Sequence, residues 1–419
     1  MRFLAAADIH IGRVPSLPED HPGAHGRGAW LAVVECAITR AVDAVLLAGD
    51  IVQSENGFFE AFGALSTGVA RLKAAGIPVI GIAGNHDAGI AHKIAQEIPG
   101  MTLLGRNGRW EDYDFNGLII KGWSFPDSSY TRNPMESFEV PQAGVPWIGL
   151  LHCDLDGPST SRYAPVPSGD LERTGGDWIL GHTHVGGVRG RYSRAFYCGS
   201  TFALDLSEEG AHGAWLIEVG DEGRITSKEH VRLSPWVYET LTVDAEGVGD
   251  LDGLRSRVAT TMQKSSRDSG LADLGSVYYT LRFEGQCRMA GRIMRELASA
   301  GLEDLRLGET GACVMPSGKL YDDTQAELDL AGLAAEHGAI GTLAGLILAL
   351  NTGGSEPEGL AGTLSEVGGW IGDLTPLSVA EWTKTSGPPT HTDPKKVVQR
   401  AANRLLLSLV AQREERGTR

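Results

Sequence analysis

Short apolar runs alternate with stretches of helical periodicity through the first hundred residues of the chain. Residues 2–7 (RFLAAA), 43–48 (DAVLLA) and 77–83 (IPVIGIA) are runs of the kind expected for parallel strands buried on both faces. Between them, residues 30–42 and 58–75 carry apolar positions three and four residues apart, which predicts helices. This alternation predicts βαβ units.

Strands become more frequent after residue 110. Asn116-Gly117 separates two runs within residues 110–123, and this dipeptide is a strong hairpin signal. Further strand-like segments occupy residues 145–151, 177–180, 189–200 and 212–233. The last two are expected to form antiparallel hairpins. We therefore predict an α/β fold, a two-sheet sandwich flanked by helices, in which loops from the strand ends meet at one edge. This domain is expected to span residues 1–235.

A smaller unit is predicted at residues 236–318, with β-α-β-α order. Its expected strands and helices lie at residues 237–243, 251–264, 276–283 and 287–300. Residues 319–384 are predicted to form an acidic helical region, because residues 320–382 contain ten acidic residues and no Lys or Arg.

The end of the sequence has a different charge. Residues 385–393 (TSGPPTHTD) are predicted to be a linker. Asp393 then resembles an N-cap, with Pro394 at the first helical position, so residues 394–419 are predicted to be a C-terminal helix. From Asp393 onward there are seven basic and three acidic residues.

Composition limits the location and the partners. The first residues, MRFLAAADIHIG, contain one basic residue and predict a strand rather than a signal peptide, and the apolar run at 339–350 is too short to span a bilayer. Five cysteines without a CxxC pair favour a reducing cytoplasm over a disulfide framework. A net charge of −16 does not suit a protein that coats DNA by bulk charge.

Polar motifs follow directly on the apolar runs. They are Asp8-Ile9-His10, Gly49-Asp50, Gly84-Asn85-His86-Asp87, His152 and Gly181-His182-Thr183-His184. Such Asp, Asn and His side chains at strand ends can hold two divalent metals about 3.5–4 Å apart, which neutralise phosphate charge and acidify a water between them. Asp50 is the natural bridging carboxylate, and manganese or iron accepts this mixed ligand set. A closed structural zinc site would more usually contain cysteine.

These motifs resemble the calcineurin-like metallophosphoesterases. Within that family the chain is similar to DNA-repair exonucleases of the SbcD type, and especially their YhaO-like branch. The segments that carry the closer likeness are Ala7–Gly12, Leu151–Asp154, Tyr197–Thr201 and Gly213–Glu218. The resemblance covers residues 1–235 strongly, and residues 236–318 resemble the family's capping domain more weakly.

The resemblance implies a role for each motif residue. One metal would be held by Asp8, His10, Asp50 and His184, and the second by Asp50, Asn85, His152 and His182. His86 would face the scissile phosphate and protonate the leaving oxygen or stabilise the transition state, and Asp87 would fix the His86 tautomer. The resemblance also implies two Mn²⁺ ions, a 3′→5′ exonuclease with or without endonuclease activity, DNA as substrate, an SbcC-like coiled-coil ATPase as partner, and a homodimer without a membrane.

Several alternatives remain open from the sequence. Arg189, Arg191 and Arg194 follow the last motif and either contact phosphate or belong to a solvated hairpin. His21 and His25 are exposed loop residues or substrate contacts. The helix at 394–415 is a solvated helix, a DNA contact or a docking helix for the ATPase. A phosphoesterase of small phosphate esters or cyclic nucleotides, or a non-enzymatic scaffold with structural metals, would use the same five motifs.

Overall fold

The computed structural model describes residues 1–16, 26–54, 58–268, 276–300, 313–326, 329–352, 361–362, 364–368 and 393–417. The chain divides into two compact units, Met1–Tyr238 and Glu239–Arg419. His21 and His25, most of the predicted linker at 385–393, and much of the predicted acidic region at 319–384 lie outside the described residues.

The first unit contains a six-stranded sheet built around the predicted βαβ units. Its strand order is β13-β12-β1-β2-β3-β4. The strands are β1 (Arg2–Ala6), β2 (Ala44–Ala48), β3 (Val79–Ile82), β4 (Met101–Leu104), β12 (Gly213–Val219) and β13 (Ile225–Arg232). Strands β1 to β4 pair in parallel, whereas β12 pairs antiparallel with both β1 and β13. The predicted hairpin at 212–233 is therefore confirmed.

A five-stranded sheet lies against the first, in the order β11-β10-β7-β6-β5. Its strands are β5 (Glu111–Phe115), β6 (Leu118–Trp123), β7 (Trp147–His152), β10 (Asp177–Gly181) and β11 (Ala195–Tyr197). Asn116 and Gly117 form the predicted turn with φ of 53° and 89°. Both sheets contribute to one buried core, which includes Phe3, Leu46, Ile120 and Leu150. The α/β two-sheet fold predicted from the sequence is confirmed.

The predicted antiparallel hairpin at 189–200 is wrong. Strand β11 pairs in parallel with β10, with Trp178 opposite Ala195. Parallel neighbours need a crossover instead of a tight turn. The intervening chain, residues 182–194, provides that crossover and carries His182 and His184 out of the sheet.

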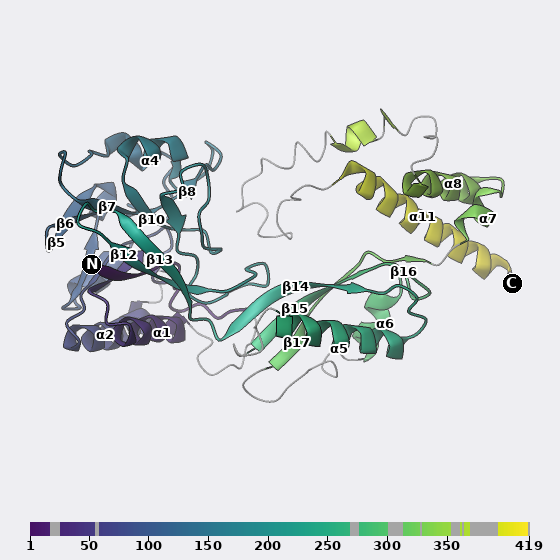
Figure 1. Cartoon of the computed structure of the whole chain (residues 1–419), viewed down its shortest axis with the longest axis horizontal. Coiled ribbons are helices and arrows are strands. Elements are labelled where there is room, and N and C mark those ends of the chain that lie inside the picture. Colours follow the sequence, from purple (N-terminus) through teal and green to yellow (C-terminus); the bar gives the residue numbers. More distant parts are fainter. Residues whose placement is uncertain are drawn as a thin grey trace. The chain divides into compact units, whose positions relative to one another are not determined.

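Helices cover the outer faces of this unit (Figure 1). Helices α1 (Gly26–Thr39) and α2 (Phe58–Ala74) pack together, and the fully buried Trp30 donates from Nε1 to the Ala64 oxygen at 3.1 Å. The smaller elements are α3 (Ala91–Gln96), α4 (Ser168–Thr174), β8 (Asp154–Leu155), β9 (Pro165–Val166) and the 3₁₀ turns Arg106–Gly108 and Pro134–Ser137.

The second unit begins within β14 (Trp236–Asp244), which forms a three-stranded sheet with β15 (Ser276–Glu284) and β17 (Cys313–Asp322). Helices α5 (Leu251–Asp268) and α6 (Ile293–Ala300) complete the predicted β-α-β-α order. The second helix begins later than predicted, because β16 (Gln286–Cys287) pairs first with β18 (Gln325–Ala326).

Three described helices complete the second unit: α7 (Leu330–Ala334), α8 (Ala339–Thr352) and α11 (Pro394–Gly417). They share a core that includes Leu333, Ile347 and Leu406. Asp393 Oδ1 accepts from Lys395 N at 2.9 Å, so the predicted N-cap is confirmed.

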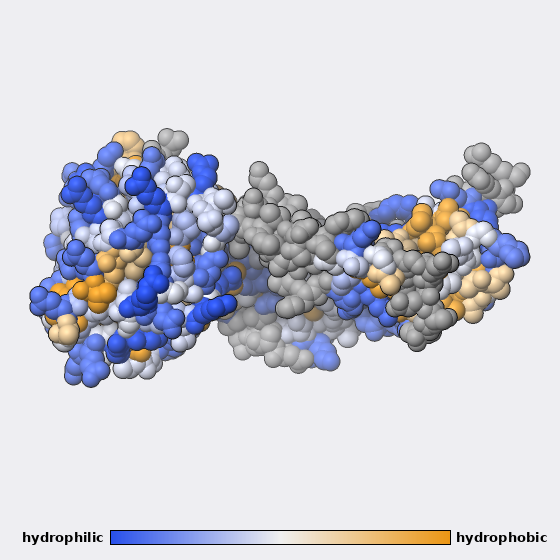
Figure 2. All heavy atoms as spheres, turned by 90° about the horizontal axis from the view of Figure 1, so that it is seen from above, coloured by the Kyte–Doolittle hydropathy of each residue, from blue (hydrophilic) through white to orange (hydrophobic). Residues whose placement is uncertain are grey.

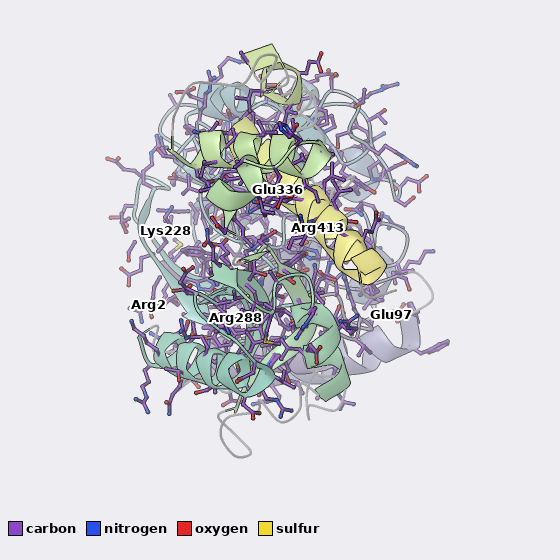
Figure 3. All side chains as sticks on the ribbon, turned by 90° about the vertical axis from the view of Figure 1, so that its right-hand side faces the viewer. Arg2, Glu97, Lys228, Arg288, Glu336 and Arg413 are labelled. Atoms are coloured by element: carbon purple, nitrogen blue, oxygen red, sulfur yellow. The ribbon has the colours of Figure 1, made fainter. Side chains whose placement is uncertain are left out.

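The surface of this helical group mixes charge with apolar side chains. Arg413 Nη1 lies 2.7 Å from Glu336 Oε2 (Figure 3). Apolar residues also reach the surface here (Figure 2), among them Leu405, which is 52% exposed. Among the described helices, none combines the length and the apolar character needed to cross a membrane.

Candidate metal centre

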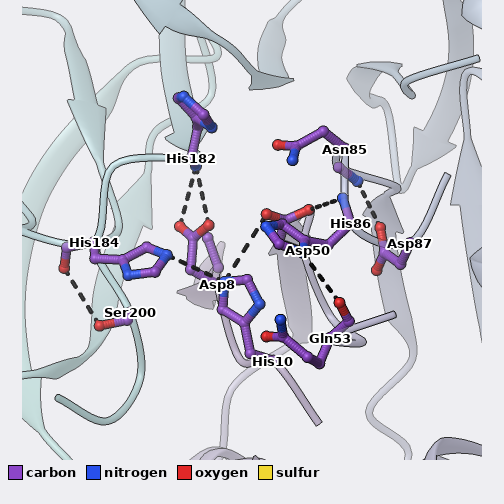
Figure 4. Close-up of polar contacts among 12 residues, drawn as sticks. Asp8, His10, Asp50, Gln53, Asn85, His86, Asp87, His182, His184 and Ser200 are labelled. Atoms are coloured by element: carbon purple, nitrogen blue, oxygen red, sulfur yellow. Dashed lines mark hydrogen bonds and ion pairs between the residues drawn. The ribbon is translucent and has the colours of Figure 1, made fainter. Parts of the chain in front are cut away.

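The structure brings the five polar motifs together at the carboxyl ends of the central strands (Figure 4). Asp8, Asp50 and Asn85 follow β1, β2 and β3 of one sheet, while His152 ends β7 and His182 follows β10 of the other. Backbone hydrogen bonds connect the loops to one another, since the His10 N–H donates to the backbone carbonyl oxygen of Asp50 at 3.1 Å. The parallel direction of these strands is what collects the motifs at one edge.

The backbone is strained at four of the motif residues. Asp8, His10, Asp50 and His182 have φ values of 49°, 49°, 50° and 102°, in the left-handed region that non-glycine residues rarely adopt. Each such conformation costs on the order of 1–3 kcal/mol and persists only where the surroundings impose it. Four cases in one cluster indicate that the loops are shaped to converge their side chains.

Two motif glycines make the close approach possible. A Cβ on Gly84 would lie 2.2 Å from Asp50 Oδ1 and 2.6 Å from Asp50 N. A Cβ on Gly49 would lie 2.6 Å from His152 Nδ1. Glycine at these two positions therefore allows the motif side chains to come close.

The side chains form three overlapping groups of potential metal ligands. They are Asp8 with His10 and His184, Asp8 with Asp50 and His152, and His10 with Asp50 and His86. Asn85 Oδ1 joins the second group, because it lies 3.2 Å from His152 Nε2. Asp50 belongs to two of the groups and has its Oδ2 atom 3.4 Å from His152 Nε2 and 3.9 Å from His10 Nε2.

Two histidines have one ring nitrogen occupied and the other turned toward the centre. Nδ1 of His152 lies 3.0 Å from the Ala48 oxygen, and Nδ1 of His184 lies 2.7 Å from Glu208 Oε1. Each oxygen accepts from a protonated Nδ1, so in the neutral ring the lone pair available to a metal is on Nε2. Metal-ligating histidines in proteins are held in this way.

Burial and mutual interaction shift the pKa values of these groups. Burial favours a neutral Asp50, but the His152 and His10 rings outweigh it and lower the Asp50 pKa. Burial lowers the pKa of His152, yet the Asp50 carboxylate more than compensates and raises it to about 9. Burial raises the pKa of Asp8 to about 6, and burial together with His152 lowers that of His182 to about 3.

The donor set fits divalent metal ions. Asp8 and His10 are fully buried and Asp50 is 2% exposed, so the carboxylates and imidazoles face one another with little water to solvate them. Nε2 of His10 lies 3.1 Å from Nε2 of His184, and the buried Nδ1 of His10 has no hydrogen-bond partner among the described residues. Oxygen and imidazole ligands without a thiolate suit manganese, iron or zinc in an open site.

His86 and Asp87 are adjacent in sequence but have different surroundings. His86 is the exposed residue of the centre, its Nδ1 lies 3.0 Å from the Gln53 oxygen, and its ring lies 4.9 Å from that of His10. Asp87 is fully buried and accepts from the backbone N–H groups of Ile51, Val52 and Gly84 at 2.7–3.1 Å.

The expectation that Asp87 fixes the His86 tautomer is therefore wrong. The tight turn after Gly84 directs the Asp87 carboxylate back toward the loop after β2, where it ties two strand ends together. The Gln53 carbonyl occupies the place behind His86 that the sequence assigned to Asp87.

His182 and the three arginines lie at the edge of the centre or away from it. The His182 N–H donates to both Asp8 oxygens at 3.1 Å, while its ring lies 5.3 Å from that of His152. Arg194 forms a two-point ion pair with Asp177 at 2.9 and 3.0 Å, so its guanidinium is engaged structurally instead of being free for phosphate. Arg189 and Arg191 are exposed.

Glu208 and the Gln53 carbonyl were missed by the sequence reasoning. Glu208 is 7% exposed, and His184 and Glu208 hold each other in the charged form, raising the pKa of His184 and lowering that of Glu208 to about 2 against the effect of burial. Neither residue belongs to a strand-end motif. A buried glutamate within an otherwise polar loop gives no periodic signal.

Comparison with known proteins gives a family and two curated relatives. Residues 1–193 match the calcineurin-like phosphoesterase family. An uncharacterized metallophosphoesterase of Bacillus subtilis, YhaO, is 27% identical over 63% of this chain and 68% of its own length. The DNA double-strand break repair protein Mre11 of Methanosarcina mazei is 26% identical over 59% of this chain and 40% of its own length. The match thus covers less than half of that Mre11.

A solved structure is also similar in part. The dimetal phosphatase from Danio rerio shares 13% identity with a TM-score of 0.35, over 56% of this chain and 99% of that chain. A likeness this distant adds nothing to the functional argument.

Proposed function

We propose that the chain is a dimetal DNA nuclease whose chemistry resides in residues 1–193, the part that matches the calcineurin-like phosphoesterase family. The observation that carries the proposal is the position of Asp50, whose Oδ2 atom lies 3.4 Å from His152 Nε2 and 3.9 Å from His10 Nε2, one residue from each assigned ligand set. A carboxylate so placed can serve two ions at once.

We assign the ligand roles accordingly. Asp8, His10, Asp50 and His184 hold one ion, and Asp50, Asn85, His152 and His182 hold the other, with Mn²⁺ as the physiological metal. His182 is the outlying member of this set, with its ring centroid 5.3 Å from that of His152. When bound, the ions supply charge neutralisation and an acidified water for attack on phosphorus.

His86 is assigned to the leaving group. Its Nδ1 faces the Gln53 carbonyl, so Nδ1 carries a proton in the neutral ring and Nε2 is free to face substrate. A protonated Nε2 at this exposed position can donate to the departing sugar oxygen. The His86 backbone N–H donates to Asp50 Oδ1 at 2.9 Å, which fixes the residue beside the centre.

DNA as the substrate is supported by the resemblance to the SbcD type and by the likeness to a protein named for double-strand break repair. The same resemblance supports 3′→5′ exonuclease polarity, a homodimer and an SbcC-like ATPase partner in a cytoplasmic complex. The net charge of −16 favours a partner that supplies part of the DNA-binding surface. Helix α11, with Leu405 exposed, is the segment we assign to docking that partner.

A second candidate is a phosphoesterase of small phosphate esters or cyclic nucleotides. The metal centre favours neither substrate, since the chemistry at phosphorus is the same. What distinguishes the two candidates lies outside the metal centre, in the residues that follow the first unit.

The test compares Mn²⁺-dependent cleavage of labelled single- and double-stranded DNA with hydrolysis of a panel of small phosphate esters. Cleavage of DNA is expected, and it should fall by about 10²- to 10⁴-fold in His86→Ala while Mn²⁺ binding persists. Equal cleavage by the variant would remove the role of His86. Hydrolysis confined to the small esters would favour the second candidate.

A further inference from the structure

Glu208 is a buried carboxylate that lies directly behind His184. Its Oε1 atom lies 2.7 Å from His184 Nδ1, and its Oε2 atom accepts from Ser200 Oγ at 3.1 Å and from Leu204 N at 2.8 Å. Both oxygens therefore face donors. Only an ionised carboxylate, which accepts at every position, satisfies all three.

The segment Tyr197–Thr201, part of the sequence signature, builds the support for this carboxylate. Ser200 is fully buried, and its N–H donates to the His184 oxygen at 2.8 Å, so it holds the backbone of His184 as well as Glu208. His212 completes the network. Its Nδ1 atom lies 2.8 Å from Ser200 Oγ, and its Nε2 atom lies 3.1 Å from the backbone carbonyl oxygen of Glu208. The signature thus has a physical role outside the ligand set.

The two ligand histidines are supported unequally. The partner of His152 Nδ1 is a neutral carbonyl, that of Ala48, at 3.0 Å. The partner of His184 Nδ1 is a carboxylate at 2.7 Å. Hydrogen bonds to a charged acceptor are shorter and about twice as strong as neutral ones. A carboxylate behind an imidazole also increases the basicity of its other nitrogen toward a metal.

We propose that Glu208 is a positioning residue that makes the subsite of Asp8, His10 and His184 the tighter of two unequal metal subsites. The inference rests on the proposed function, because it concerns the same centre. Glu208 acts through His184: it fixes the ring so that Nε2 points at the ligand group, and its charge strengthens that nitrogen as a donor. The subsite around His152 and Asn85 lacks such support and binds its ion more weakly.

The experiment is a calorimetric titration of the metal-free full-length protein with Mn²⁺. Wild type is expected to bind two ions in two resolved events of different affinity. Glu208→Gln removes the negative charge, and its amide nitrogen cannot accept the hydrogen bonds that a carboxylate oxygen accepts. The Mn²⁺ affinity of the tighter binding event should therefore fall by about 10- to 100-fold. Glu209→Gln, a change of the exposed neighbouring carboxylate, is the matched control and should leave both events unchanged.

Two further variants and one spectrum complete the test. Asn85→Ala should lower the affinity of the weaker binding event, which would assign that event to the subsite of His152 and Asn85. Ser200→Ala removes one of the three hydrogen bonds to Glu208 and should weaken the tighter event by about fivefold, so it carries the test if Glu208→Gln does not fold. In the ¹⁵N spectrum of metal-free wild type, His184 should be protonated at Nδ1, the state in which it donates to Glu208 Oε1.

The outcomes separate this inference from the function beneath it. If wild type binds no Mn²⁺, the proposed function itself fails. If wild type binds two ions and both Glu208→Gln and Ser200→Ala bind them as wild type does, only the role of Glu208 is overturned. A neutral His184 ring protonated at Nε2 instead of Nδ1, or two events of equal affinity in wild type, would also overturn it.

Discussion

The two units of the chain use their polar side chains differently. In Met1–Tyr238, the carboxylates and imidazoles that follow the strands face one another, and three groups of potential metal ligands result. In Glu239–Arg419, a described carboxylate such as Asp323 is paired with Arg282 at 2.6 Å and Arg400 at 3.5 Å. Ionisable groups gathered in a buried cluster are costly to desolvate, and such clusters with shifted pKa values are typical of functional sites.

In the function that we propose, the first unit carries the chemistry and the second unit contributes to recognition. The local backbone supports the assignment, because Asp8, His10, Asp50 and His182 all have positive φ. Structural strain of this kind clusters at functional sites. Four changes can break or sharpen the comparison.

The largest effect is expected from Asp50→Ala. The variant loses the carboxylate shared by two ligand groups, and with it several kcal/mol of charge stabilisation at phosphorus, so Mn²⁺-dependent hydrolysis should fall on the order of 10⁴-fold. Initial rates at saturating Mn²⁺ measure this. Hydrolysis that survives in Asp50→Ala would place the chemistry elsewhere. If the folded wild-type protein itself does not hydrolyse phosphate esters, the non-enzymatic scaffold is favoured.

Acid should weaken metal binding by a smaller but still large factor. The pKa of His152 is raised to about 9 by Asp50, which outweighs burial, so below pH 9 an incoming ion must displace a proton from this ring. Apparent Mn²⁺ affinity should therefore fall about tenfold per pH unit as the pH decreases from 8 to 6. Near pH 6 it should fall more steeply, because burial raises the pKa of Asp8 to about 6. Affinity that does not vary with pH would contradict this reading of the centre.

Gly84→Ala tests the packing of the centre against a matched glycine. The new Cβ would lie 2.6 Å from Asp50 N, which cannot move freely, so the variant should lose about 1–3 kcal/mol of stability and bind Mn²⁺ more weakly. Gly63→Ala, in helix α2, meets nothing within 4 Å and should gain up to about 1 kcal/mol. Thermal denaturation compares the two. Equal stability changes would argue against the close approach of the loops after β2 and β3.

The smallest effect on chemistry is expected from Leu406→Ala in the second unit. Leu406 is fully buried between α11 and α8, so its truncation should cost about 2–5 kcal/mol in the stability of these helices. Hydrogen exchange in α8 and α11 should become faster, while hydrolysis of a small phosphodiester stays at the wild-type rate. A loss of that hydrolysis would mean that the second unit contributes to the chemistry itself.

The sequence predicted the central strands and the converging residues because both depend on short-range pattern. Each motif follows its strand within a few residues, and parallel strands bring such ends together without further information. The prediction for Asp87 failed because its partners, Ile51 and Val52, lie in a different loop. Adjacency to His86 in the sequence implied a contact that the tight turn does not allow.

Glu208 and β11 show a second limit of the sequence. Glu208 lies 24 residues after His184, and only the fold brings them together. The parallel pairing of β11 follows from the crossover that carries His182 and His184, whereas the local pattern of residues 189–200 fits either pairing direction equally well. Long-range pairing of this kind requires the three-dimensional structure.

The most direct test of the central claim is anomalous diffraction from crystals of the full-length protein soaked with Mn²⁺. The account predicts two anomalous peaks about 3.5–4 Å apart, with the Asp50 carboxylate touching both ions. One ion should also contact His184 Nε2 and the other His152 Nε2. A single peak away from Asp50, or no peak among the motif residues, would contradict the dimetal centre on which the proposed function depends.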